Sequence, residues 1–292
     1  DGLSHTSYLH LTETLGTYGN RLVSAERFVS DFRSTRTAIE IAAFAEAGEI
    51  SREIAERAFS NEVITPGVTT LEDVAWWMSD QQLERGLESS FDMPSVYITG
   101  PEGIAATSTD RIIQRGDLLM LDWGVGYLDF YTDMKRIAYV LRDGETEAPQ
   151  GIQFAFDQAL EVRNVMKTSI KPAASAQIAL DVTLAAITAA GFNQIAFNQP
   201  SSDSSVTDVV IGPHSVGNWG HGIGPSLAFF NPEQLTYELR PSTLISIELF
   251  AYTANPDWDN AKIRIPLEDD AIVTERGVEW LYPANSRILI IK

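Results

Sequence analysis

The sequence predicts an α+β fold in which duplicated helices, related by a pseudo-two-fold axis, cover a curved antiparallel sheet. A long helix, a proline turn, a second helix and β-hairpins follow one another in residues 35–140, and this order returns in residues 147–290. The openings of the second helices, ITPGVTTLEDV and IKPAASAQIAL, line up by eye. Two halves of one plan are typical of a single pseudo-symmetric domain. Chance similarity between two helix N-termini is the alternative.

Spacing and turn residues predict the elements in order. Residues 35–60 are rich in alanine, glutamate and isoleucine at helical spacing, and a Pro-Gly turn and a threonine cap open a second helix within residues 64–86. Two further helices are expected over residues 148–169 and 170–192. Apolar, β-branched stretches predict strands; they lie at 95–100, 117–141, 242–254, 269–275 and 286–292. Upstream, residues 21–33 read as a short strand and a turn.

The 292-residue chain is acidic and contains no cysteine. Its 21 Lys and Arg against 40 Asp and Glu give a net charge of −19, which repels phosphate backbones and argues against a nucleic-acid partner. The lack of cysteine leaves His, Asp and Glu as metal ligands. It also slightly favours a secreted or periplasmic location over the cytoplasm, and both stay open. No apolar run approaches the roughly 18 residues of a membrane span.

Two carboxylates flank a predicted hairpin. An apolar run ends on Asp122, and Asp133 follows eleven residues later. On antiparallel strands these two side chains are expected to face each other across the ladder. Like charges that close repel each other unless a cation lies between them or one is protonated, and a divalent metal is the commoner solution. A turn-capping role for one or both is the alternative.

Further candidate ligands lie downstream. His214 and His221 are separated by six residues in the glycine-rich stretch GPHSVGNWGHGIG, a composition that brings backbone close to a ligand. Glu248 lies in an otherwise apolar strand, where a lone carboxylate is costly unless it is paired or binds a metal. Glu268 precedes another strand. The order Asp, Asp, His, Glu, Glu suits a dinuclear hydrolytic metal site.

These segments resemble the pita-bread metallopeptidase superfamily, which includes methionine aminopeptidase, aminopeptidase P, prolidase and creatinase. LDWGVGYLDFYTDMKR is similar to its Asp-x-Gly-then-Asp segment, and ISIEL and LEDDAIVTERGVEWL are similar to its two glutamate-bearing strands. The resemblance covers roughly residues 33–290 and is strongest to the Xaa-Pro peptidase branch. It implies the pita-bread fold, with residues 33–292 as the catalytic domain and residues 1–32 as the tail or remnant of an N-terminal domain. Relatives often dimerise, so a homodimer is also expected.

The resemblance implies two divalent metal ions, manganese, iron, cobalt or zinc. Their ligands would be Asp122, Asp133, His214, Glu248 and Glu268. In this scheme Asp133 and Glu268 bridge the ions. Glu248 is also catalytic, as the general base that takes a proton from the attacking water.

The two histidines can be assigned in two ways. GHGIG at residues 220–224 imitates the metal-histidine motif of methionine aminopeptidases, which would make His221 the ligand. The commoner family spacing, a metal histidine followed after six residues by a substrate-facing histidine, favours His214 as the ligand. His221 is then the catalytic group that stabilises the oxyanion.

The implied activity is hydrolysis of small peptides with proline after the scissile bond. One departure from the family pattern concerns the stretch GPEGIAATSTDRI, which has Thr107 and Ser108 where family peptidases carry a further histidine. A non-peptidase enzyme acting on another small molecule, such as a creatinase-like C–N hydrolase or a metal-assisted lyase, is one alternative. A catalytically impaired binding protein is another.

Charged residues close to Glu268 give two smaller expectations. Asp269 and Asp270 read as exposed. Arg264 is expected either to meet a substrate carboxylate or to pair with Asp269.

Overall fold

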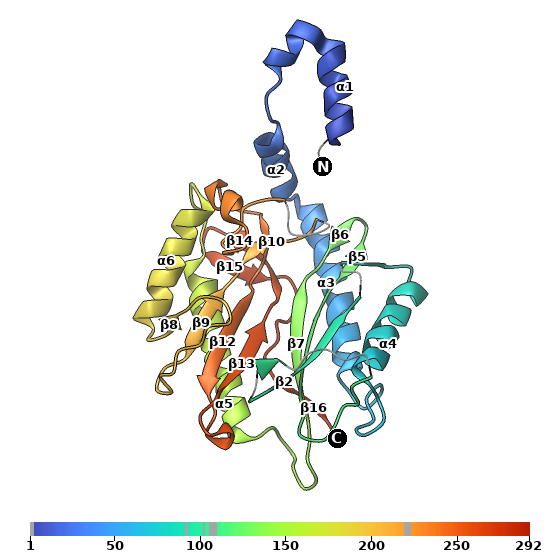
Figure 1. Ribbon diagram of the computed structural model, residues 1–292, viewed down its shortest axis with the longest axis vertical. Helices are drawn as coiled ribbons and strands as arrows, with labels where there is room; N and C mark the ends of the chain where they lie inside the picture. Colours follow the sequence, from blue (N-terminus) through green and yellow to red (C-terminus); the bar gives the residue numbers. More distant parts are fainter. Residues whose placement is uncertain (1–2, 91–92, 102, 105–109, 219–222) are drawn as a thin grey trace.

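The computed structural model describes residues 3–90, 93–101, 103–104, 110–218 and 223–292. Two helix pairs lie on the two sides of the molecule, each beside its own sheet (Figure 1). The helices are α1 (His5–Leu15), α2 (Glu26–Ser34), α3 (Ala38–Ala58), α4 (Leu71–Glu84), α5 (Gln150–Ser169) and α6 (Ala176–Ala189), with short 3-10 helices at Gly16–Arg21, Pro232–Thr236 and Pro256–Trp258.

The first half places α3 and α4 against one sheet. Thr37 and Thr70 cap these helices, each in a reciprocal capping box with an acidic residue three positions on. The sheet has the order β16-β7-β4-β2-β3, and β2, β4 and β7 are antiparallel neighbours. Its strands are β2 (Ser95–Gly100), β3 (Gly103–Ile104), β4 (Leu118–Trp123), β7 (Met134–Val140) and β16 (Leu289–Ile291).

The second half repeats this plan with α5 and α6. Ser175 caps α6, and α5 begins after Pro149. The sheet has the order β13-β12-β9-β8, and β9, β12 and β13 are antiparallel neighbours. Its strands are β8 (Asn193–Gln194), β9 (Asp208–Ile211), β12 (Leu249–Ala254) and β13 (Lys262–Leu267). The predicted α+β fold with duplicated helices is therefore confirmed.

Two smaller sheets complete the described part of the chain. One contains β1 (Glu88–Ser89), β5 (Val125–Tyr127) and β6 (Phe130–Tyr131). The other contains β10 (His214–Ser215), β11 (Leu244–Ser246), β14 (Asp270–Thr274) and β15 (Gly277–Trp280). In each half the chain thus leaves the larger sheet, enters a smaller one and returns.

The described residues form two large hydrophobic cores, one on each face of the first sheet. One core gathers buried side chains from α3, α4, β2, β4 and β7. The other gathers them from α5, α6, β9, β12 and β13, and it also includes alternate residues of β4 and β7, so it joins the two halves. The two larger sheets meet where the Lys135 backbone N–H donates to the Glu268 carbonyl, 3.1 Å away. The polar seam where the two sheets meet is therefore flanked by a hydrophobic core that both halves share.

The N-terminal segment differs from expectation. Residues 21–33 were predicted as a strand and a turn, but residues 26–34 form α2. The prediction was wrong because an amphipathic pattern of alternating charges and apolar residues over so few positions fits either period. Helix α1 has no buried residue and projects from the body (Figure 1). None of the described helices combines the length and hydropathy needed to cross a bilayer.

Gly48 allows α3 to pack against the Tyr282 ring. A Cβ at residue 48 would lie 2.1 Å from Tyr282 Cδ1, and Tyr282 is 4% exposed. We expect Gly48→Ala to destabilise the fold by about 1–3 kcal/mol because the ring cannot move within a packed core, although alanine is the better helix former. Urea denaturation measures this loss. Gly19→Ala is the control, since its Cβ would meet nothing closer than 3.7 Å; equal stability of the two variants would contradict the prediction.

Candidate metal centre

The five predicted ligands lie where the chain passes between sheets. Asp122 precedes the step from β4 to β5, and Asp133 lies between β6 and β7. His214 begins β10 just after β9, Glu248 separates β11 from β12, and Glu268 follows β13 before β14. At each step the strand bends at the seam between the two halves, so these polar side chains converge there.

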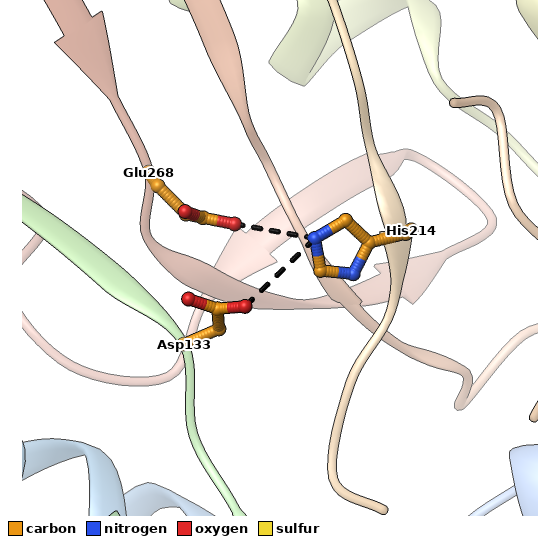
Figure 2. A group of neighbouring side chains, drawn as sticks. All are labelled: Asp133, His214 and Glu268. Atoms are coloured by element: carbon orange, nitrogen blue, oxygen red, sulfur yellow. Dashed lines mark ion pairs between the residues drawn. The ribbon is translucent and has the colours of Figure 1, made fainter. Parts of the chain in front are cut away.

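Three of the side chains form a compact buried group. Asp133, His214 and Glu268 each offer one ligand atom, and these atoms lie within 4.8 Å of one another. The His214 Nε2 atom is 3.3 Å from Glu268 Oε1 and 3.9 Å from Asp133 Oδ2, and all three side chains point toward one another (Figure 2). His214 is 1% exposed and Glu268 is fully buried. Two carboxylates and an imidazole in this arrangement form a donor set that suits a divalent transition metal.

Lys135 lies among the other carboxylates, and the sequence reasoning missed it. Its Nζ is 3.1 Å from Asp122 Oδ2 and 2.8 Å from Glu248 Oε1, and it also contacts Glu268 Oε2. The signal was present, because a residue two positions after Asp133 in a strand faces the same side of the sheet. Lys135 therefore enters the polar seam beside the predicted ligands.

The expected pairing of Asp122 with Asp133 across the ladder was wrong. In the register of β4 and β7, Asp122 lies opposite Lys135 and Trp123 lies opposite Met134. Asp133 precedes β7 and lies outside the ladder. The inserted β5 and β6 shift the register, and a Cβ on Gly124 would lie 1.8 Å from the Thr132 carbonyl oxygen, so glycine permits this close approach.

The buried carboxylates around His214 and Lys135 favour the positively charged forms of these two side chains. Burial lowers the pKa of His214, but the hydrogen bond and charge of Glu268 outweigh this effect and raise the pKa to about 9. Burial also opposes ionisation of Lys135, yet Asp122, Glu268 and Glu248 hold its pKa well above the usual value. Burial raises the pKa of Glu248 and of Asp122, with Lys135 acting in the opposite direction. A bound cation would relieve the remaining repulsion between the carboxylates.

Asp269 and Asp270 were expected to be exposed, but both are fully buried. Asp269 lies 2.8 Å from Arg136 Nη1 and 3.0 Å from Arg163 Nη1. Asp270 accepts hydrogen bonds from the Asp133 backbone N–H and the Tyr282 hydroxyl. The prediction failed because an acidic run is typical of solvated chain, whereas these residues lie at the step from β13 to β14, which crosses the buried seam.

The residues fit one metal ion and only part of the expected dinuclear set. Asp133, His214 and Glu268 can hold a cation between them. Asp122 and Glu248 instead contact the Lys135 ammonium. A second ion would need the same carboxylate oxygens as ligands, at about 2.0–2.2 Å, and the ammonium already occupies them. The number and identity of the ions remain predictions.

A cavity of about 280 Å³ adjoins the cluster. Asp122 and Lys135 form part of its wall, and Phe197, Phe250 and Arg264 form another part. The Arg264 guanidinium stacks on Phe250, with 4.3 Å from its carbon to the ring centroid. Its Nε has no hydrogen-bond partner among the described residues. The predicted alternative, an ion pair between Arg264 and Asp269, was wrong. Asp269 pairs with Arg136 and Arg163 instead.

A larger cavity, of about 950 Å³, lies among α1, α2 and Tyr237. None of the predicted ligands lines it. The smaller cavity beside Lys135 is therefore the candidate substrate site. Three residues singled out in the sequence, Thr107, Ser108 and His221, lie outside the described residues.

Comparison with known proteins identifies the family. The model of metallopeptidase family M24 matches residues 42–275. The chain belongs to metallopeptidase family M24. The M24 chain is 24% identical to the uncharacterized peptidase YqhT of Bacillus subtilis over 315 residues, which cover 99% of this chain and 76% of that protein. The resemblance to the pita-bread metallopeptidases is confirmed, and with it assignment to a metal-dependent family of hydrolases.

Solved structures share the fold of this M24 chain. An X-Pro aminopeptidase from Thermotoga maritima matches with a TM-score of 0.73 and 18% identity, covering 99% of this chain and 72% of that one. An Xaa-Pro dipeptidase from Bacillus anthracis matches with a TM-score of 0.69 and 22% identity, with the same coverage. A prolidase from Pyrococcus horikoshii matches with a TM-score of 0.70 and 21% identity, covering 99% and 74%. These matches confirm the pita-bread fold.

Proposed function

We propose that this M24 member is a metal-dependent peptidase that hydrolyses short peptides with proline after the scissile bond. The observation that carries the proposal is the buried Asp133, His214 and Glu268 group next to a cavity with an aromatic and cationic wall. The names of the structural matches, Xaa-Pro dipeptidase and prolidase, agree with this substrate class.

The chain's own residues supply the remaining chemistry. A divalent ion held by Asp133, His214 and Glu268 would polarise the scissile carbonyl and lower the pKa of a water molecule. Glu248 is suited to take the water's proton, since its Oε2 lies 3.9 Å from His214 Nε2 and burial raises the pKa of its carboxyl group. His221 is proposed to stabilise the oxyanion.

A series of aromatic rings favours proline as part of the substrate. The ring centroids of Phe230 and His214 are 6.0 Å apart, and those of Phe229 and Phe230 are 5.3 Å apart. The ring centroid of Phe197 lies 5.5 Å from that of Phe229 and 5.3 Å from that of Phe250. These rings connect the metal-ligand group to the cavity, and aromatic surfaces pack well against the flat, apolar proline ring.

Arg264 is proposed to bind the free carboxylate of a dipeptide. The wild-type protein supplied with manganese should hydrolyse Ala-Pro faster than Ala-Pro-amide. In Arg264→Leu we expect the KM for Ala-Pro to rise about 10- to 150-fold, because a hydrogen bond to a charged group contributes about 1.5–3 kcal/mol, while the KM for the amide changes little. Steady-state kinetics on both substrates measure this difference.

Arg287→Leu is the matched control, because Arg287 is 71% exposed and does not line the cavity. Absence of Ala-Pro hydrolysis with manganese, iron, cobalt and zinc would contradict the proposed function. Equal loss on both substrates in Arg264→Leu would instead contradict only the role of Arg264.

One observation favours a second candidate function. The Lys135 ammonium supplies fixed positive charge among the carboxylates, as a metal-free, creatinase-like C–N hydrolase would require. Hydrolysis of a small non-peptide amide or guanidino compound after exhaustive chelation would favour this candidate over the peptidase.

A further inference from the structure

We infer that the Lys135 ammonium permanently replaces one of the two metal ions expected from the family, so that the centre binds a single ion. The inference rests on the proposed metal-dependent function and concerns the same centre. It begins from the three acceptors of the ammonium, which belong to Asp122, Glu248 and Glu268. An ammonium has three N–H donors, so three carboxylates satisfy it completely.

Glu268 shows how the ammonium and an ion would share the centre. Its Oε1 lies 3.3 Å from His214 Nε2 and accepts a hydrogen bond from Ser246 Oγ at 2.6 Å. Its other oxygen, Oε2, contacts the Lys135 ammonium. The carboxylate thus bridges the three-residue ligand group and the lysine. This is the position in which a bridging carboxylate would join two cations.

Glu248 is divided in the same way. Its Oε1 is 2.8 Å from Lys135 Nζ, and its Oε2 is 3.9 Å from His214 Nε2. Asp122, by contrast, contacts the lysine through Oδ2, and its buried Oδ1 has no hydrogen-bond partner among the described residues. The two cation positions are therefore distinguishable, one bounded by His214 and the other occupied by Nζ.

The surroundings hold the ammonium in place. Lys135 is 7% exposed, and its backbone is fixed by pairing with Asp122 on β4 and with Glu268. A second ion would have to displace Nζ from all three carboxylates. The displaced charge would then lie buried without a carboxylate partner, which strongly disfavours binding of a second ion.

Formal charge agrees with one ion. Four carboxylates, those of Asp122, Asp133, Glu248 and Glu268, surround the two positions. Lys135 offsets one of these charges and a divalent ion offsets two. The centre then keeps a small net negative charge. A second ion beside the lysine would make this net charge positive and bring three cations close together.

Metal counting tests the inference. The chelator-stripped protein is titrated with Mn²⁺ alone, and bound metal per chain is counted by elemental analysis and native mass spectrometry. Wild type is expected to bind one ion, with the paramagnetic resonance spectrum of an isolated Mn²⁺. Lys135→Thr, which removes the ammonium and leaves its carboxylate partners, is expected to bind two and to show a spin-coupled pair. Lys135→Arg keeps the charge and should bind at most one.

Lys262→Thr is the matched control, because the Lys262 side chain is only 6% exposed and also pairs with a carboxylate, Asp208 at 2.6 Å, outside the centre. It should bind one ion. Two ions in wild type would overturn the role of Lys135 and leave the proposed peptidase intact. No ion in wild type or in any folded variant would contradict the metal-dependent function itself. If Lys135→Thr fails to fold, the count and spectrum of wild type still decide between one ion and two.

Discussion

Replacing Glu268 with glutamine is expected to weaken metal binding and to lower kcat/KM for Ala-Pro by at least about 100-fold. Loss of a group that only supports a metal ligand costs up to about 100-fold, and Glu268 is itself a proposed ligand. The carboxylate accepts from Ser246 on one oxygen and contacts Lys135 with the other. A glutamine must turn its NH₂ group toward one of these sides. It would therefore place a donor against the ammonium, or against the hydroxyl and the metal-ligand group. Calorimetric Mn²⁺ titration and steady-state kinetics measure the two losses.

Glu238→Gln is the control for this variant, because Glu238 pairs with Arg240 at the surface and is 46% exposed. Its metal affinity and turnover should match those of wild type. If Glu268→Gln retained both properties, Glu268 would not be a ligand.

Replacing Asp269 with asparagine is expected to cause the largest loss of stability, about 3–5 kcal/mol, because removing one partner leaves buried charges uncompensated. Asp269 is fully buried between Arg136 and Arg163, at 2.8 and 3.0 Å, and also accepts from the Asn285 backbone N–H. Asparagine retains the neutral hydrogen bond but not the charge. Urea denaturation gives the change in the free energy of unfolding.

The surface pair of Arg276 and Glu279 provides the comparison. These side chains are 85% and 47% exposed, so Glu279→Gln should change stability by less than about 1 kcal/mol. Similar losses in the two variants would contradict the role given to Asp269. The same result bears on the centre, since Arg136 follows Lys135 in β7 and Asp269 follows Glu268, and their ion pair fixes these two segments together.

Local patterns predicted the helices because each signal acts within a few residues. The predicted ranges 35–60 and 148–169 contain α3 and α5, and Thr37 and Thr70 begin helices through hydrogen bonds to nearby residues. The order of the five candidate ligands was also readable, since isolated acids in apolar strands such as Glu248 need a partner. The structure brings them to one seam, while their roles as ligands remain predictions.

The register and the true neighbours were not readable. The short strands β5 and β6 interrupt the hairpin, so Asp122 faces Lys135 instead of Asp133. Burial of Asp269 depends on Arg163, 106 residues away in sequence, which no local pattern connects to it. The contacts of Asp122 and the burial of Asp269 therefore depend on charged partners that lie far away in the sequence or out of the expected register.

Anomalous scattering from crystals grown with Mn²⁺ most directly tests whether this seam is a metal centre. The chelator-stripped protein is crystallised with manganese in excess, and a map is calculated at the manganese edge. We expect one peak, bounded by Asp133, His214 and Glu268, with the Lys135 ammonium still in contact with Asp122 and Glu248. A map without a peak among these side chains would contradict the metal centre, and a second peak in place of the ammonium would contradict the single-ion arrangement.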